Sequence, residues 1–197
     1  MGSKRHSDIT INPNDSGSVI TTPFEMIPGG VSDFIFQGPF CFHFFFRTTD
    51  DQIGCFGENF HGQLGTGNNS INKTPLLRRE ISGIPSSSEI LSISANFWAT
   101  FILTKKGEVY SSGAKGSNGY PYSTNKFQKL PFETPIIRVS SGCSHAFFLS
   151  SGGDVFYCSR SDNDKLPETI KKKPPLPGTT LSRLDDLRFP ELPMKEL

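Results

Sequence analysis

Two segments of the chain repeat one another in register, and this repeat limits the possible folds more than any other feature. Residues 139–149 read VSSGCSHAFFL and residues 93–103 read ISANFWATFIL, so matched hydrophobic positions lie 46 residues apart without a gap. Each segment is followed by a glycine, Gly107 or Gly153, and then by two further apolar residues. A repeat of this length indicates an array of small supersecondary units.

The short apolar runs and turn residues of the repeated region predict an all-β fold. A third, looser copy lies upstream, with an apolar run at 41–46 followed by a second run at 53–57. Short runs of Val, Ile, Phe and Tyr are joined by turns containing Lys-Gly or Gly-Gly, which is typical of β-hairpins. Segments 76–84 and 129–137 are predicted as additional edge strands. Four short strands in a repeat of about fifty residues match one blade of a β-propeller.

The chain divides into three predicted regions. Residues 1–28 are polar and lack a helical or strand period, so we expect a flexible N-terminal arm. Residues 29–166 hold the propeller repeats. Residues 167–197 form a tail rich in proline and lysine, in which the leucines at 181, 184 and 187 and a capping pair, Ser182 with Asp185, predict a short helix.

Composition gives few hints of a ligand. The net charge of +1 gives no general attraction to nucleic acid. The four cysteines lack the spacing of a zinc or redox motif, and we expect neither a metal nor a cofactor. No signal peptide begins the chain and no apolar run is long enough to span a membrane. We therefore expect an intracellular protein with reduced thiols, cytoplasmic rather than nuclear.

Two segments resemble a known repeat family. Residues 57–67, GENFHGQLGTG, resemble the Gly-x-Asn-x-x-Gly-Gln-Leu-Gly-x-Gly hallmark of the regulator of chromosome condensation repeat family, and residues 139–149 resemble its second signature. The resemblance covers about residues 31–165. It implies a seven-bladed propeller, for which this chain has material for about three blades. We expect a partial propeller that does not close alone and that self-associates through its open blade edges.

The signature residues have a structural interpretation. A phosphate-binding loop would need Gly-Lys-Ser/Thr and a following helix, which are absent. Glycines in turns with positive φ, an asparagine bonding local backbone and a buried histidine bonding backbone explain the pattern better. We expect His43 and His61 to be buried in the same way and Trp98 to pack on a strand. The predicted structural residues are Gly57, Asn59, Gly62, Gln63, Leu64, Gly65, Gly67, Gly142 and His145.

The tail contains a candidate docking motif. Lys171, Pro174 and Pro177 fit the basic-x-x-Pro-x-x-Pro pattern bound by Src-homology-3 domains, and the prolines also resemble a WW-domain ligand. A plain proline-rich linker with a solvated charge run is the alternative, and we favour it.

These observations favour a non-catalytic protein–protein interaction module. The family resemblance implies an alternative, a guanine-nucleotide exchange factor or regulator of a Ran-like small GTPase, because the founding member of the family has that activity and binds chromatin. Fold likeness alone is weak support for an activity. No motif places a nucleophile or an acid beside His145, so we do not expect an enzyme.

Overall fold

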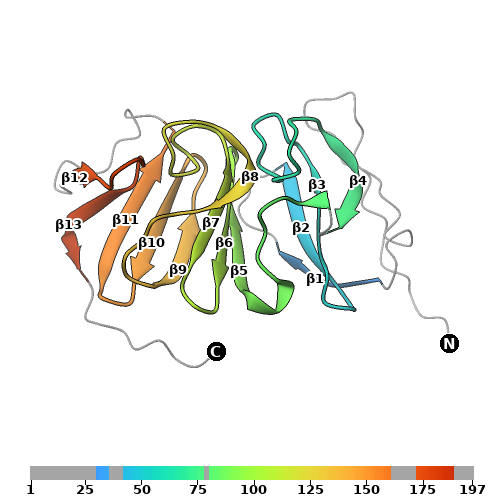
Figure 1. Cartoon of the computed structure of the whole chain (residues 1–197), viewed down its shortest axis with the longest axis horizontal. Helices are drawn as coiled ribbons and strands as arrows, with labels where there is room; N and C mark the ends of the chain where they lie inside the picture. The colour runs from blue at the N-terminus through green and yellow to red at the C-terminus, as the bar shows by residue number, and fades with distance from the viewer. Residues whose placement is uncertain (1–29, 36–41, 78–79, 161–171, 189–197) are drawn as a thin grey trace.

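Three antiparallel sheets stand side by side in the computed structural model, which describes residues 30–35, 42–77, 80–160 and 172–188 (Figure 1). Blade 1 contains, in spatial order, β1 (Val31–Ile35), β2 (His43–Thr48), β3 (Ile53–Gly57) and β4 (Asn72–Leu77). Blade 2 contains β5 (Ile90–Ala95), β6 (Ala99–Thr104), β7 (Val109–Gly113) and β8 (Thr124–Lys129). Blade 3 contains β9 (Ile136–Ser141), β10 (His145–Ser150), β11 (Asp154–Ser159), β13 (Ser182–Arg188) and β12 (Lys172–Pro175).

The predicted all-β fold of about three blades is confirmed. The first three strands of blades 2 and 3 coincide with the two copies of the 46-residue repeat. In each copy a glycine with positive φ closes the hairpin between the second and third strands. Gly107 has φ +79° and donates its amide to Thr104 O at 2.9 Å, and Gly153 has φ +83° and donates to Ser150 O at 3.0 Å. The turn chemistry therefore repeats together with the apolar pattern.

The core lies between the blades rather than inside any one of them. Strand β6 is buried at every position, because both of its faces are covered. Phe101 packs toward blade 3, where its ring meets Phe148 edge-on with centroids 5.2 Å apart. Ile102 points the other way and packs with Phe45 of blade 1. The apolar run at the middle of the repeat is thus explained by its place between two neighbours.

A buried histidine links blades 1 and 2. His43 is 2 % exposed, and its Nε2 lies 2.8 Å from Thr100 Oγ1 in hydrogen-bonding geometry. Its partner is a side chain, whereas we expected a backbone group. The other ring nitrogen, Nδ1, has no hydrogen-bond partner. Burial lowers the pKa of His43 to about 3.

The His43 pKa predicts a pH dependence of stability. The unfolded chain has the ordinary histidine pKa of about 6.5 and binds a proton that the folded chain excludes. The free energy of unfolding is therefore highest above pH 6.5 and declines as the pH falls toward 3. Between pH 6.5 and pH 5 we expect this residue to cost about 2 kcal/mol of unfolding free energy.

The test compares urea unfolding of the wild type and of His43→Gln over pH 5 to 7. Glutamine keeps a polar group near Thr100 but does not titrate. The unfolding free energy of the variant should therefore depend on pH less steeply, by the uptake of about one proton on unfolding. Equal pH dependence in both proteins would contradict the assignment.

The short helix predicted in the tail is wrong. Ser182–Arg188 forms β13, which pairs antiparallel with β11 and places Leu184 opposite Val155. The three-residue leucine spacing reflects packing on two sides of a sheet. Leu181 is buried in the core shared with blade 2, whereas Leu184 packs with Val155 and Tyr157 on the other side. The tail thus supplies the fourth and fifth strands of blade 3, β13 and β12. The predicted N-terminal arm, residues 1–28, lies outside the described residues.

The fourth strands of blades 1 and 2 lie upstream of the predicted segments. They are β4 and β8, and not residues 76–84 and 129–137. Pro75 lies inside β4, an edge strand, where a residue without an amide proton is tolerated. Ile136 and Ile137 belong to β9, the first strand of the next blade.

Candidate functional site

The family hallmark is a loop held together by a buried asparagine. Asn59 is fully buried, and its Nδ2 donates to Thr66 Oγ1 at 3.0 Å and to Asn68 O at 2.9 Å. Its Oδ1 accepts the amide of Leu64 at 2.9 Å. Gln63 is also buried, and its Oε1 accepts the amide of His61 at 2.9 Å. These polar groups are used inside the loop and are not directed at a ligand.

The same loop docks on β7 and β8 of the next blade. Ser112 Oγ donates to Gly62 O at 2.6 Å, and the amide of Gly67 donates to Asn125 O at 2.7 Å. Gly62 has φ +80°, and a Cβ there would lie 2.5 Å from the Cα of Asn125. A Cβ at Gly65 would likewise lie 2.4 Å from the Phe127 ring. Glycine is therefore required for the close approach of the two blades.

The loop between β7 and β8 of blade 2 lacks the hallmark sequence but keeps this arrangement with a different asparagine. Asn118 is fully buried, donates to Gly113 O at 3.0 Å and to Tyr122 O at 3.1 Å, and accepts the amide of Tyr120 at 2.9 Å. The loop then docks on blade 3, where the amide of Thr180 donates to Gly119 O at 2.9 Å. The sequence motif is lost here, but the inter-blade contact remains.

His145 is half-buried, in contrast to the buried ring that we expected. Its imidazole lies over Gly142, where an added Cβ would come 2.4 Å from Nε2. The ring also contacts Phe147 and Tyr157, with centroids 5.5 and 6.2 Å away. Among the described residues no hydrogen bond to the imidazole is found, so the expected bond to backbone is absent there. In blade 2 the equivalent pair is Asn96 and Ala99, and Asn96 Oδ1 instead accepts the Ala99 amide at 2.8 Å.

Aromatic side chains from different blades meet at the end of the molecule where these loops lie. The Phe42 and Phe97 rings are 5.6 Å apart, Phe97 and Trp98 are 4.5 Å apart, and His61 lies 4.8 Å from Trp98. The guanidinium carbon of Arg160, at the end of blade 3, lies 3.5 Å from the Trp98 ring centroid. We call these five residues the loop-end patch.

The loop-end patch is accessible from outside. Phe42 is 46 % exposed, and Phe60, which precedes His61 in the chain, is 56 % exposed. Trp98 and Phe97 are half-buried, and Arg160 is exposed. Burial, helped by the positive charge of Arg160, lowers the pKa of His61, which keeps its ring neutral beside the aromatic rings. A contiguous aromatic surface with one cation is typical of a binding face.

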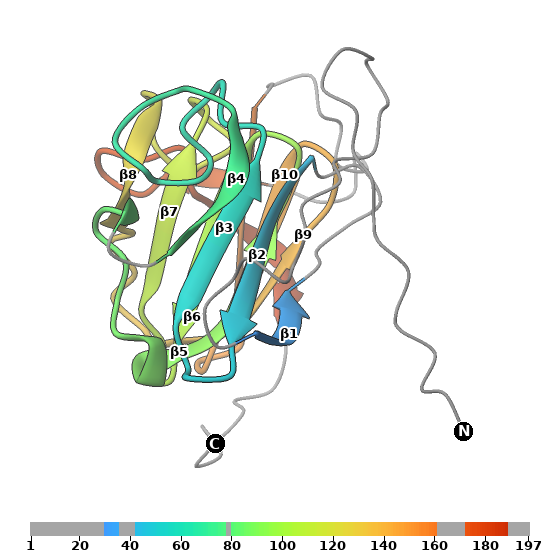
Figure 2. The same cartoon turned by 90° about the vertical axis from the view of Figure 1, so that its right-hand side faces the viewer.

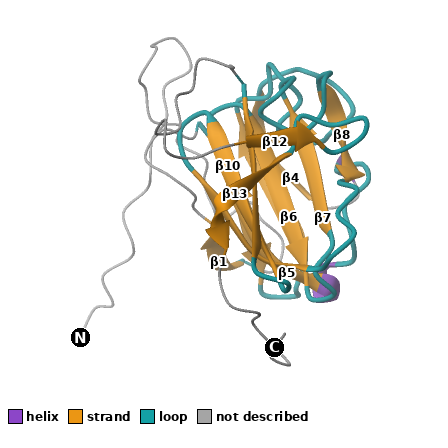
Figure 3. Cartoon of the chain, turned by 90° about the vertical axis from the view of Figure 1, so that its left-hand side faces the viewer, coloured by secondary structure: helices purple, strands orange, loops and turns teal. Residues whose placement is uncertain are grey.

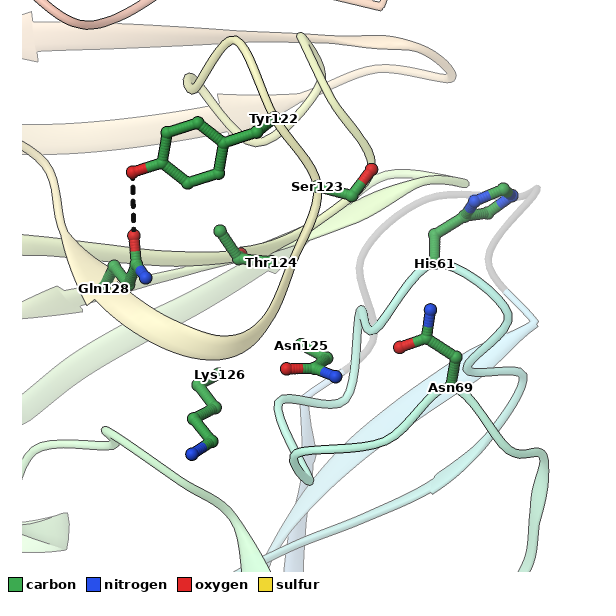
Figure 4. A pocket seen from close by; sticks show the side chains of 8 residues that line it. All are labelled: His61, Asn69, Tyr122, Ser123, Thr124, Asn125, Lys126 and Gln128. Atoms are coloured by element: carbon green, nitrogen blue, oxygen red, sulfur yellow. Dashed lines mark hydrogen bonds between the residues drawn. The ribbon is translucent and has the colours of Figure 1, made fainter.

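A polar cleft borders the loop-end patch at His61 and lies beside the contact between the hallmark loop and β8 (Figure 4). One hydrogen bond crosses its wall, from Tyr122 Oη to Gln128 Oε1 at 3.3 Å. Amide and hydroxyl groups predominate, and Lys126 supplies a positive charge. The lining residues are His61, Asn69, Tyr122, Ser123, Thr124, Asn125, Lys126 and Gln128.

Three features of the described residues bear on metal binding and thiol or imidazole reactivity. They contain no cluster of three His, Cys, Asp or Glu side chains able to hold a metal ion. Cys55 and Cys158 are buried, and burial raises the pKa of the Cys158 thiol to about 12, so it stays protonated and unreactive. His43 is enclosed between blades. Within the same part of the chain, no helix has the length and apolar character needed to cross a membrane.

The candidate docking motif of the tail is partly described. Pro174 and Pro177 are exposed, and Pro175 pairs with Ser182 where β12 meets β13. Lys171 lies outside the described residues. Recognition by a Src-homology-3 or WW domain stays a prediction.

Comparison with solved structures identifies the architecture. The chain is similar to human WBSCR16, with 16% identity and a TM-score of 0.57 over 85% of this chain and 48% of that one. It is also similar to yeast RCC1 (Prp20) bound to Kap60, with 18% identity and a TM-score of 0.52 over 87% of this chain and 42% of that one. The chain has the fold of RCC1-type propeller repeats.

A second structure of Prp20p, from Saccharomyces cerevisiae, gives the same result, with 21% identity and a TM-score of 0.51 over 89% of this chain and 41% of that one. The RCC1-type chain thus spans less than half the length of each of these neighbours. No protein-family model and no curated protein sequence matches it. At these identities the likeness establishes the fold and the resemblance predicted from the hallmark, and leaves the activity to be argued from the residues.

Proposed function

We propose that this RCC1-type chain is a non-catalytic protein-binding module that contacts its partner through the loop-end patch. The observation that carries the proposal is the chain of ring contacts from Phe42 through Phe97 and Trp98 to His61, with Arg160 stacked on Trp98. Aromatic residues and arginine are enriched at the centres of protein interfaces. The hydrogen-bonded loops around the patch hold these side chains in place before a partner arrives, which lowers the entropic cost of binding.

Electrostatics favour a partner with carboxylates at the contact. Arg160 lies exposed on the loop-end patch, and Lys126 lines the polar cleft next to it. A carboxylate of the partner can pair with either cation while its apolar groups cover Phe42 and Trp98. Protein probes for this surface are suggested by the neighbours, because the Prp20p structure is described with binding properties to Gsp1p and histones.

The proposal is tested by measuring binding of the full chain to a purified Gsp1p-type small GTPase and, separately, to core histones. We expect a direct complex with one of these proteins. A Trp98→Ala, Arg160→Ala double variant should weaken it by about 30-fold or more, the loss typical of a central interface residue. The control is Ile71→Ala, which removes another exposed hydrophobic side chain, 40 % exposed, outside the loop-end patch. Absence of binding to both probes, or equal binding by the folded double variant, would contradict the proposal.

Nucleotide exchange on a Ran-like GTPase is the second candidate function, favoured by the likeness to yeast RCC1. Exchange of this kind needs binding energy rather than acid–base residues, so the lack of an assembled catalytic group does not exclude it. The family resemblance implies a contact surface spread over several blades, and we therefore expect no acceleration of exchange. The measurement is release of labelled GDP with stoichiometric protein. Faster release would show exchange-factor activity and would contradict the proposal of a binding module alone.

A further inference from the structure

Each blade presents one residue directly after its third strand, at the end of the molecule that carries the loop-end patch. These residues are Glu58 after β3, Ala114 after β7 and Arg160 after β11. The amide of Glu58 donates to Phe42 O at 2.8 Å, and the amide of Arg160 donates to Ser144 O at 3.2 Å. Figure 2 shows β3 and β7 finishing at the same end of the molecule, and in Figure 3 the longer loops gather there. The three residues therefore occupy equivalent places in a row.

The charge at these equivalent positions changes sign along the row of blades. Glu58 is acidic, Ala114 is neutral and Arg160 is basic. Arg160 stacks on Trp98, with its guanidinium carbon 3.5 Å from the ring centroid. Glu58 is bonded through its amide to Phe42, at the other end of the chain of ring contacts. The loop-end patch thus has an acidic end on blade 1 and a basic end on blade 3, with aromatic rings between them.

The Glu58 carboxylate lies at this surface without a cation. It is half-buried, and in the described part of the chain it makes neither a hydrogen bond nor an ion pair. Burial raises the pKa of Glu58, and no neighbouring positive charge lowers it. A partner that covered this carboxylate with apolar groups alone would remove water without replacing its hydrogen bonds, which costs free energy. A basic side chain of the partner satisfies the carboxylate, so this position selects partners by their charge.

Positive charge lies on blades 2 and 3. Arg160 and Lys115, which follows Ala114, are exposed, and Lys126 of β8 lines the polar cleft. A nucleic acid would bring phosphates against Glu58 as well as against these cations, because its backbone carries a negative charge at every nucleotide. A protein surface can carry charges of both signs in one contact. The charge pattern therefore favours a protein partner over a polyanion.

We infer that the partner bound by the loop-end patch is a protein that places a lysine or arginine against Glu58 and a carboxylate against Arg160, with an apolar group between them on the aromatic rings. The inference rests on the proposed function and adds to it the charge and the direction of the contact. An arginine can pair with a carboxylate through two parallel N–H···O bonds, which fixes its orientation as well as its position. Because the ends of the patch have opposite charges, a partner placed in the reverse direction meets repulsion at both ends.

The test measures binding of Glu58 variants of the full chain to the same two probes, a Gsp1p-type small GTPase and core histones. Glu58→Gln keeps the shape of the side chain and removes its charge, and it should weaken the complex by about 10-fold. Glu58→Lys sets a cation against the cation of the partner and should weaken the complex by about 100-fold or more. Circular dichroism establishes that each variant is folded.

Glu133 provides the matched controls, Glu133→Gln and Glu133→Lys, which change the net charge by the same amounts. Glu133 is exposed and lies three residues before Ile136, whose amide donates to Gly107 O at 2.9 Å. This contact is at the hairpin turn between β6 and β7, at the opposite end of blade 2 from Trp98. Charges so far from the contact are screened by salt, so both controls should bind within about two-fold of the wild type.

The outcomes separate this inference from the proposed function. If the Trp98→Ala, Arg160→Ala double variant loses binding while folded Glu58→Lys binds as the wild type does, the binding module stands and the charge assignment is overturned. Tighter binding by Glu58→Lys would show that the partner is negatively charged at this point and would also overturn it. Equal weakening by Glu58→Lys and Glu133→Lys would mean that only net charge matters, with the same consequence. Absence of binding to both probes would contradict the proposed function and this inference together.

Discussion

Replacing Gly113 with serine should lower the free energy of unfolding by about 3 kcal/mol or more. Gly113 ends β7 with φ +131°, a conformation that residues with a side chain rarely adopt. A Cβ there would lie 2.3 Å from Trp98 O and 2.6 Å from the Cα of Ala99. Both atoms are backbone, so they cannot move aside as the end of a flexible side chain can. Strain and overlap therefore add at this position.

The repeat supplies the matched control for Gly113→Ser. Ser159 occupies the equivalent position 46 residues later, and its φ is not positive. Ser159→Gly should cost no more than about 1 kcal/mol, the usual penalty for glycine in a strand. Urea unfolding, followed by circular dichroism, gives both values. Similar losses in the two variants would contradict the strained turn assigned to blade 2.

Phe101→Ala should lower the free energy of unfolding by about 3–5 kcal/mol, the range for truncating a fully buried phenylalanine. The ring is 0 % exposed and contacts Phe148 of the neighbouring blade. Its loss would leave a cavity between two sheets that are each held by their own hydrogen-bond ladders. Those ladders resist collapse into the cavity, so we expect a value in the upper part of the range.

Phe147→Ala is the control for this prediction, since it removes the same side chain at the equivalent repeat position. The half-buried Phe147 ring should contribute about half as much as Phe101 or less. Urea unfolding of both variants measures the two losses. An equal loss would mean that the outer face of blade 3 is covered as completely as the face of blade 2.

The strands of blades 2 and 3 were predictable because local and global patterns agree there. The apolar runs, the Gly107 and Gly153 turns and the 46-residue offset all require the same hairpins. The fourth strands were not predictable in the same way. Proline is typical of strand ends, and the leucines at 181 and 184 follow a helical spacing, but in both places pairing with the third strand of the blade determines the structure.

The loop-end patch was missed because its members are far apart in the sequence. Trp98 was expected to pack on a strand, yet it lies in the turn between β5 and β6. One signal could have located the patch. Phe42 immediately precedes β2, as Trp98 immediately precedes β6, so the two aromatic residues occupy equivalent repeat positions at the same end of neighbouring blades. The contribution of Arg160 follows only from the three-dimensional structure.

The central claim is that the repeats stack as propeller blades with Phe101 of blade 2 packed on Phe148 of blade 3. A double-mutant cycle with Phe101→Leu and Phe148→Leu tests it, because leucine keeps both sites apolar while removing the edge-to-face contact. The stacked blades predict a coupling of about 0.5–1.5 kcal/mol in the free energy of unfolding. Additive losses, within about 0.3 kcal/mol, would show that the two rings do not meet and would contradict the blade arrangement.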